Sequence, residues 1–278
     1  MNTGTVIAMG VIAGATIFIG LPVGRLSARA AGLRAMLNAI TIGVLLFLLW
    51  DVLTHAVDPV ESALTDAAIK HTASWWPFIG LAALLFAATG AGLIGLAGYD
   101  RWIAARGEGK GPRQFKASPG GVLRLAEPAS RLAFLIAVGI GLHNFSEGLA
   151  IGQSAASGQL GLAVVLVVGF ALHNATEGFG ITAPMAASAV RPSWGQLALL
   201  GLIGGGPTLV GTLVGSVFVN DALALAFLAL AAGSIIYVLV QLIGVALKMG
   251  RGYTLYVGIL IGLLAGFATD FVVTAAGV

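Results

Sequence analysis

The chain has 278 residues, of which 58% are hydrophobic and only 9% are charged. Because soluble globular proteins carry about 25% charged residues, this composition excludes a soluble globular domain. The chain has no cysteine, which also excludes disulfides and thiolate metal ligands.

Apolar runs of about 20 residues, the length of a transmembrane helix, occur eight times along the chain. Their approximate bounds are 4–24, 35–57, 77–99, 130–156, 160–188, 194–219, 222–247 and 253–275. We therefore expect an all-α integral membrane protein with eight transmembrane helices in one domain, residues 1–278. The first run has no basic residue before it and no small-residue cleavage pattern, so we expect a retained span rather than a signal peptide. In the sixth run, Gly204, Gly205 and Gly206 precede Pro207 and predict a broken or kinked helix.

The loops between these runs predict the orientation of the chain. All but one of the 14 Lys and Arg residues lie in or beside alternate loops, and the exception is Lys70. Because cytoplasmic loops are enriched in Lys and Arg, both termini are expected outside. Residues 100–128 are then the one long cytoplasmic loop, and residues 58–76 are expected to form a short amphipathic helix on the outer surface. The net charge of +3 follows from this topology and requires no nucleic acid partner.

Two polar residues lie near the end of the second run. Asp51 and His55 are four residues apart, so their side chains share one face of a helix. A polar pair costs little close to a membrane interface. A role in binding metal and a purely structural role therefore both remain open.

The fourth and fifth runs carry almost the same polar phrase at their centres. The two copies are His143 to Gly148 (HNFSEG) and His173 to Gly178 (HNATEG). An acid at the centre of a membrane helix costs roughly 2.5–3.5 kcal/mol on insertion scales, and such residues usually mark an ion or proton path. In each copy the histidine and glutamate lie four residues apart on one helix face. Imidazole nitrogen, carboxylate oxygen and the neighbouring asparagine oxygen suit zinc and similar divalent metals.

The two copies are expected to face each other near the middle of the bilayer. Because consecutive spans run in opposite directions, each histidine then faces the glutamate of the other helix. His143, Glu147, His173 and Glu177 would enclose one mixed nitrogen and oxygen site. The two carboxylates would neutralise one divalent cation, and an empty site would take up a proton on one of them. Acidification is therefore expected to weaken metal binding.

Other interpretations of the phrase remain open at this point. A buried His–Glu pair can be a simple hydrogen bond between helices, and Gly148 and Gly178 can serve close packing alone. The main functional alternative is an intramembrane zinc-dependent hydrolase, although the chain has no HExxH motif. A metal sensor or chaperone would normally carry an output domain, and none is evident here.

The repeated phrase resembles the HNxPEG motif of the ZIP family of divalent metal transporters. Two further stretches are similar to that family: residues 50–55 (WDVLTH), followed by Pro59 and Glu61, and residues 233–237 (GSIIY). The resemblance implies uptake of zinc, or of iron, manganese or cadmium, into the cytoplasm. We expect the chain to lie in a bacterial inner membrane. It also implies a 3+2+3 helix arrangement with an inverted repeat, often a homodimer, and an elevator-like movement of the metal-carrying helices.

By this resemblance, six residues line one metal site or two adjoining sites, and two lie at its outer entrance. The six are His143, Asn144, Glu147, His173, Asn174 and Glu177, and the entrance residues are Asp51 and His55. The metal is the transported substrate, and no organic cofactor is expected.

The chain departs from the family pattern around the expected site. Ser146 and Thr176 replace the usual prolines, so the kinks and free carbonyls that proline causes are in doubt. Gly206 and Gln241 stand where the family carries acids, which should weaken a second metal position. Residues 100–128 also lack the histidines of many relatives. We therefore expect one well-formed site rather than two.

Overall fold

The structure is a computed structural model that describes residues 2–26, 30–107, 122–188, 191–217, 220–250 and 252–275. Within these ranges the regular elements are all helical, in chain order α1 (Thr3–Ala15), α2 (Ile17–Gly20), the 3-10 helix η1 (Leu21–Arg25), α3 (Ala31–Ala68), α4 (Trp76–Gly107), α5 (Pro128–Ala156), α6 (Leu160–Ala187), α7 (Trp194–Val217), α8 (Asp221–Lys248) and α9 (Gly252–Ala275). Eight spans in the described part are long and apolar enough to cross a membrane, the first of them made of α1, α2 and η1. The predicted all-α membrane fold with eight spans is therefore confirmed.

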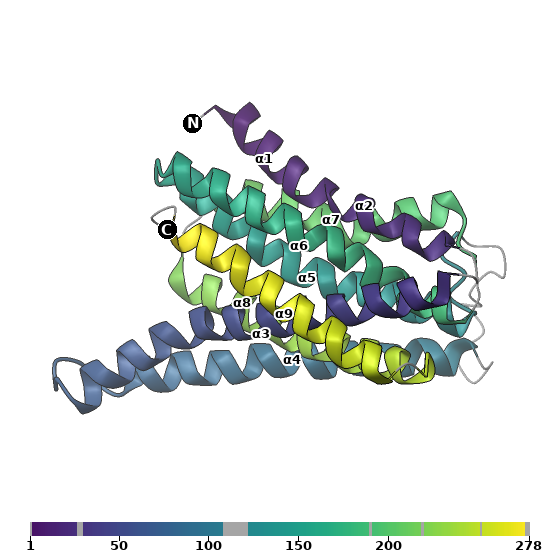
Figure 1. The fold of residues 1–278 in the computed structure, drawn as a ribbon. Helices are drawn as coiled ribbons and strands as arrows, with labels where there is room; N and C mark the ends of the chain where they lie inside the picture. Colours follow the sequence, from purple (N-terminus) through teal and green to yellow (C-terminus); the bar gives the residue numbers. More distant parts are fainter. Residues whose placement is uncertain are drawn as a thin grey trace.

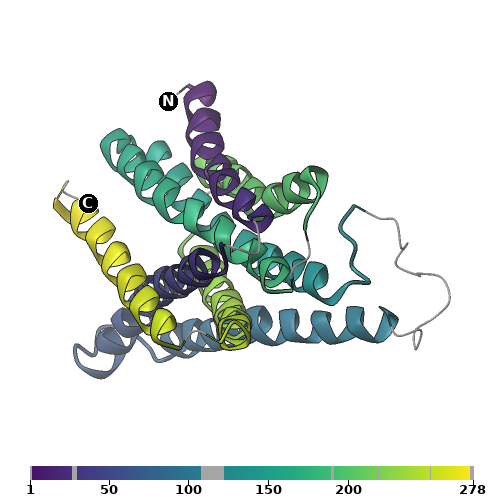
Figure 2. The ribbon, with the colours of Figure 1, turned by 45° about the vertical axis from the view of Figure 1, so that its right-hand side comes forward.

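The spans form one bundle in which α5 is the most buried and α4 and α9 are the least buried. α5 packs against α6, α7 and α8, while α3 packs against α8 and α9. Figure 2 shows α9 along one side of the bundle and α1 beside α7 at another. Both chain termini lie at the same end of the bundle, which we call the terminal end (Figure 1). The opposite end, which includes Arg25 and Lys248, is called the loop end.

Glycines bring several helices into backbone contact. On α1 and α7, a Cβ added to Gly14 or Gly205 would overlap the carbonyl oxygen of the other residue. Gly43 on α3 and Gly262 on α9 also face each other, although a Cβ on them would overlap the carbonyl oxygens of Ile259 and Ile40, and Gly233 on α8 lies against a carbonyl of α4. Such contacts allow close packing where lipid provides no hydrophobic drive between helices.

These backbone contacts divide the helices into two groups. The first, the site group, contains α1, α2, α5, α6 and α7, and the second, the flanking group, contains α3, α4, α8 and α9. At the boundary, Gly139 of α5 faces the Val238 side chain of α8, and Gly180 of α6 faces the Thr41 side chain of α3. Where an added Cβ would overlap a backbone carbonyl oxygen, the two helices thus belong to the same group, whereas at Gly139 and Gly180 the closest atom across the boundary belongs to a side chain.

The first span differs from the continuous helix expected over residues 4–24. It is interrupted at Thr16, between α1 and α2, and ends in the 3-10 helix η1. The Thr16 hydroxyl donates to the carbonyl of Ala13 (2.7 Å), and this carbonyl also accepts a hydrogen bond from Asn174 of α6 (3.1 Å). A contact with another helix therefore accompanies the interruption, and the sequence of the span alone does not predict it.

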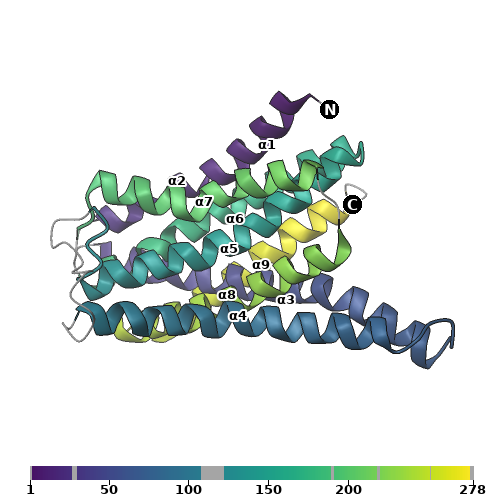
Figure 3. The same cartoon turned by 180° about the vertical axis from the view of Figure 1, so that it is seen from behind.

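α3 also differs from the prediction at its C-terminal end. Residues 58–68 continue α3 without interruption, so the separate short helix expected over 58–76 is wrong. Pro59 lies inside the helix, and the neighbouring Ala56 and Val60 are buried against Leu85 of α4. Packing against α4 therefore stabilises a helix that the proline would weaken in isolation. Figures 1 and 3 show α3 and α4 extending together past the other helices.

Two more boundaries differ from expectation. α7 is one helix from Trp194 to Val217 with Pro207 inside it, so the predicted break at residues 204–206 is absent from this described segment. Gly204 and Gly205 instead pack against neighbouring helices, Gly205 against α1, whereas Gly206 has no such contact. α4 continues to Gly107, so the loop expected over 100–128 begins later. Residues 108–121 of that expected loop lie outside the described ranges.

Candidate metal centre

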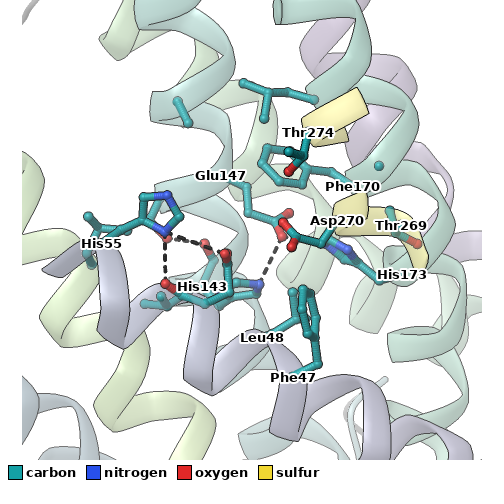
Figure 4. A pocket seen from close by; sticks show the side chains of 17 residues that line it. Phe47, Leu48, His55, His143, Glu147, Phe170, His173, Thr269, Asp270 and Thr274 are labelled. Atoms are coloured by element: carbon teal, nitrogen blue, oxygen red, sulfur yellow. Dashed lines mark hydrogen bonds and ion pairs between the residues drawn. The ribbon is translucent and has the colours of Figure 1, made fainter. Parts of the chain in front are cut away.

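Three residues of the two phrases meet at one point between α5 and α6. The Nε2 atom of His143 lies 2.9 Å from Glu147 Oε1, and the Nε2 atom of His173 lies 2.5 Å from the same oxygen. Figure 4 shows His143, Glu147 and His173 among the side chains that line one cavity. Each residue offers one ligand atom, and these atoms lie within 4.8 Å of one another. This spacing is compatible with one ion whose bonds to its ligands are about 2.0–2.2 Å long.

Glu177, the second glutamate, lies on the loop-end side of this cluster. Its Oε1 atom is 4.0 Å from His143 Nε2, and its side chain is fully buried. Each histidine therefore approaches the glutamate of the other helix, but the two distances are unequal. The structure brings all four His and Glu side chains together and places Glu147 at the centre.

Several buried atoms of this cluster have no hydrogen-bond partner. They include Glu147 Oε2 and both carboxylate oxygens of Glu177. A buried carboxylate without a partner is costly because it has lost its hydration, and a cation can compensate for that loss. The donor set and these free oxygens fit a divalent cation.

A cavity of about 390 Å³ leads from this cluster toward the terminal end. α3, α5, α6, α8 and α9 line it, so it lies between the site group and the flanking group. His143, Glu147 and His173 contribute to its lining near the middle of the bundle, and Thr274 lines it near the end of α9. The cavity therefore gives the cluster a route to one end of the bundle.

Asp51 and His55 both line this cavity on α3. The Nδ1–H group of His55 donates to the backbone carbonyl of Asp51 (2.9 Å), and the same nitrogen is 3.5 Å from the Asp51 carboxylate. This contact leaves the Nε2 atom of His55 free for another partner. The two residues share the cavity wall with His143, Glu147 and His173 but do not belong to their group of close ligand atoms.

Asp270 on α9 also lines the cavity, and the sequence reasoning missed it (Figure 4). Asp51 lines the same cavity, and the charges of the two carboxylates influence each other. A signal was present, because Asp270 is the only charged residue in the apolar run 253–275. A lone acid at membrane depth is a candidate functional residue by default.

Ser146 and Thr176 make equivalent local contacts in the two phrases. The Ser146 hydroxyl donates to the carbonyl of His143 (2.6 Å), and the Thr176 hydroxyl donates to the carbonyl of His173 (2.7 Å). A proline at either position would leave a carbonyl of the preceding turn without its donor. Here the hydroxyl groups instead donate to carbonyls next to the cluster of His143, Glu147 and His173.

The asparagines of the phrases use their amide nitrogens on other helices. Asn144 donates to the carbonyl of Gly204 on α7 (3.0 Å), and Asn174 donates to the carbonyl of Ala13 on α1 (3.1 Å). The side-chain oxygens of both asparagines are buried and have no hydrogen-bond partner. These oxygens are the atoms that the sequence suggested as metal ligands.

The remaining positions singled out from the sequence lie around the cluster. Pro207 packs toward Gly141 of α5, whereas a Cβ at Gly206 would meet no atom within 4 Å. Gln241 is half-buried on α8 and is not among the residues that line the cavity. Neither Gly206 nor Gln241 supplies a carboxylate, so the structure adds no acid from α7 or α8 at these two positions.

Comparison with known proteins adds one finding to this geometry. Residues 115–274 match a family model described as ZIP zinc transporter. The match covers more than half of the chain and includes both phrases. The comparison with curated proteins found no match.

Proposed function

The chain belongs to the ZIP zinc transporter family, and from this premise we propose that it carries zinc into the cytoplasm, with iron, manganese and cadmium as further candidate substrates. Family membership makes it a divalent metal transporter rather than an enzyme. In our proposal, residues 1–278 form one transporter domain in a bacterial inner membrane. The metal is the transported substrate.

The observation that carries the proposal is the carboxylate of Glu147, which contacts the imidazoles of both His143 and His173. Two imidazole nitrogens and carboxylate oxygens are ligands that zinc commonly takes in proteins. Glu177 lies close enough to complete the set. We propose one principal site formed by these four residues, with Asn144 and Asn174 beside it.

The charges of the site suit an ion that must cross the membrane. Glu147 and Glu177 together balance the charge of one divalent cation. A loaded site is then neutral, which lowers the cost of holding the ion in a region of low dielectric constant. This balance favours transport of a divalent cation over transport of a monovalent one.

In the proposed orientation the terminal end faces outside, in keeping with the basic residues of the loop end. The cavity then opens outward. On the loop-end side of the cluster, polar contacts join the two helix groups. Thr41 of α3 donates to the carbonyl of Thr176 (2.9 Å), and Arg34 of α3 donates to the carbonyl of Ala186 (2.9 Å). These contacts support an outward-open conformation.

We further propose that the site group moves against the flanking group during transport. The backbone contacts within each group favour movement as a unit, and the side-chain contacts between the groups favour sliding. This division supports an elevator-like mechanism, and a site near the bilayer midplane suits alternating access. The family resemblance also favours an inverted repeat and a homodimer.

Metal flux into liposomes tests the proposed function. Purified protein should take up Zn²⁺, and a panel with Fe²⁺, Mn²⁺ and Cd²⁺ should rank the substrates. His143→Ala and Glu177→Ala should each lower the initial rate by about tenfold or more, because each removes a ligand.

The control is His71→Asn, which changes an exposed histidine in the turn after α3. Asparagine tolerates the positive φ of 53° at this position. An absence of flux in folded, metal-binding wild-type protein would contradict the transport function. Full uptake by both site variants would overturn the site assignment.

Acidification should weaken metal binding to the purified protein. Protons compete with the metal for the imidazole nitrogens and the carboxylates, so binding releases protons and becomes less favourable as the pH falls. The affinity for Zn²⁺, measured by equilibrium titration, should be about tenfold lower or more near pH 5.5 than near pH 7.5. A flat affinity across this range would show that the ligands are not in competition with protons.

Asp270→Asn should weaken the entry of metal into the cavity more than it slows the transport of metal that is already bound. The carboxylate of Asp270 lines the cavity beside Asp51, where negative charge raises the local concentration of cations. Initial rates measured against Zn²⁺ concentration should show a KM raised by about three- to tenfold and a nearly unchanged maximal rate. Thr274→Val, which alters the same cavity wall without a charge change, is the control. An unchanged KM in Asp270→Asn would show that Asp270 has no role in the entry of metal into the cavity.

A further inference from the structure

The two phrases make the same first contact with two different helices. Asn144 of α5 donates its amide hydrogen to the carbonyl of Gly204 on α7. Asn174 of α6 donates to the carbonyl of Ala13 on α1. In each case the bond leaves the helix that carries the phrase and reaches a neighbouring helix of the site group.

A second matched contact lies one helical turn further along. A Cβ at Gly148 would overlap the carbonyl oxygen of Thr208, and a Cβ at Gly178 would overlap that of Ile17. Thr208 follows Gly204 by four residues, and Ile17 follows Ala13 by four residues. Each partner helix therefore presents two carbonyls one turn apart to an asparagine and a glycine that are also one turn apart.

A third matched contact runs in the reverse direction. The carbonyl oxygen of Phe145 lies against Gly211 of α7, and the carbonyl oxygen of Ala175 lies against Gly20 of α2. Gly211 follows Gly204 by seven residues, and Gly20 follows Ala13 by seven residues. The same set of three contacts thus occurs twice with the same residue spacing, once on α7 and once on α1 and α2.

Both partner helices are irregular at the level of these contacts. The Ala13 carbonyl lies beside the interruption at Thr16, whose hydroxyl also donates to it. On α7, Pro207 has no N–H group, so the Ile203 carbonyl, next to that of Gly204, lacks its usual helical donor. Each asparagine therefore donates its hydrogen bond at a place where the backbone of the partner helix departs from a regular helix. A fixed contact at such a place sets the register between the two helices.

We infer that Asn144 and Asn174 are positioning residues whose amide nitrogens, rather than their oxygens, are what metal binding requires. The asparagine and glycine of each phrase dock their helix on its partner and so fix its rotation. That rotation aims the histidine and glutamate of the same phrase at the metal. The inference rests on the proposed function, because it assigns roles within that metal site.

Asparagine-to-aspartate substitutions separate this role from that of a ligand. Aspartate has nearly the same shape, keeps an oxygen and adds a charge that favours a divalent metal, but when ionised it has no hydrogen to donate. A ligand role predicts metal binding that is retained or tightened in Asn144→Asp and Asn174→Asp. The positioning role predicts weakened binding, because the new oxygen would face the carbonyl of Gly204 or Ala13.

The experiment measures Co²⁺ binding to purified protein by optical absorption, together with Zn²⁺ uptake into liposomes. The matched control is Asn38→Asp, since Asn38 is also buried and donates its amide hydrogen to a helix carbonyl, that of Leu242 (3.4 Å), within the flanking group. Both phrase variants should bind Co²⁺ at least about tenfold more weakly than the control. They should also show a changed Co²⁺ absorption spectrum at saturating metal, because the ligands are aimed differently. Wild-type affinity and spectrum in both phrase variants would overturn the inference.

A second pair of variants keeps the test decisive where the aspartates prevent folding. Gly20→Ala and Gly211→Ala disturb the third contact of each set, and neither glycine offers a side-chain ligand. Both should weaken Co²⁺ binding relative to Gly206→Ala, whose Cβ would meet no neighbour within 4 Å. Unchanged binding in both would also overturn the inference. A folded wild-type protein that binds neither Co²⁺ nor Zn²⁺ would instead contradict the proposed function itself.

Discussion

Glu147→Gln is expected to abolish tight metal binding and uptake. Glu147 Oε1 is the one oxygen that contacts both His143 and His173, so the substitution removes the negative charge that the two imidazoles share. Glutamine preserves the shape of the side chain, and the effect therefore reports the charge. With Glu177 as the only remaining carboxylate, a bound divalent ion would keep one uncompensated charge in a buried site. We expect the affinity for Zn²⁺, measured by calorimetric titration, to fall by about 100-fold or more.

Glu61→Gln is the matched control for this variant, because Glu61 is exposed on the C-terminal part of α3. It should bind and transport Zn²⁺ as the wild type does. Equal protein abundance in the membrane must be verified for both variants. An affinity for Zn²⁺ within threefold of wild type in Glu147→Gln, with full uptake, would remove Glu147 from the centre of the site.

Gly148→Ala is expected to destabilise the protein through the contact between α5 and α7. The added methyl group would overlap the carbonyl oxygen of Thr208, and a backbone carbonyl cannot rotate away as a flexible side chain can. Overpacking of this kind costs about 1–3 kcal/mol. The melting temperature of the purified protein, measured by circular dichroism, should therefore fall by about 5 °C or more.

Gly206→Ala is the control, because Gly206 belongs to the same pair of helices and its Cβ would enter open space. Alanine favours a helix over glycine by about 0.5–1 kcal/mol, so the melting temperature should stay the same or rise slightly. Equal destabilisation by the two substitutions would mean that loss of any glycine in this pair is harmful, and that the contact with Thr208 has no special role.

Much of the membrane topology could be predicted, because apolar runs of about 20 residues are set by the bilayer rather than by tertiary contacts. The run expected at 130–156 is α5, Pro128–Ala156, and the run at 253–275 is α9, Gly252–Ala275. The meeting of the phrases followed from helix periodicity and the opposite directions of consecutive spans. The shared position of Glu147 between the two imidazoles did not follow, because it depends on how α5 and α6 rotate against other helices.

The features that sequence reasoning missed all depend on contacts between distant segments. The interruption at Thr16 accompanies a hydrogen bond from Asn174, and α3 continues past Pro59 because its neighbours pack on α4. Asp270 reaches the cavity because α9 packs closely on α3 through Gly43 and Gly262. A lone acid marks a candidate residue in a sequence, but only the packing of its helix places it in a site.

The long α3–α4 hairpin makes this small membrane protein accessible to electron cryo-microscopy. α3 has 38 residues and, at about 1.5 Å per residue, is nearly twice as long as the roughly 30 Å hydrocarbon layer. Its exposed turn, residues 69–75, is joined to the transmembrane bundle by two uninterrupted helices. A compact domain inserted into this turn would gain a rigid connection to the bundle. It would provide a fiducial mark for particle alignment at a distance from the metal site.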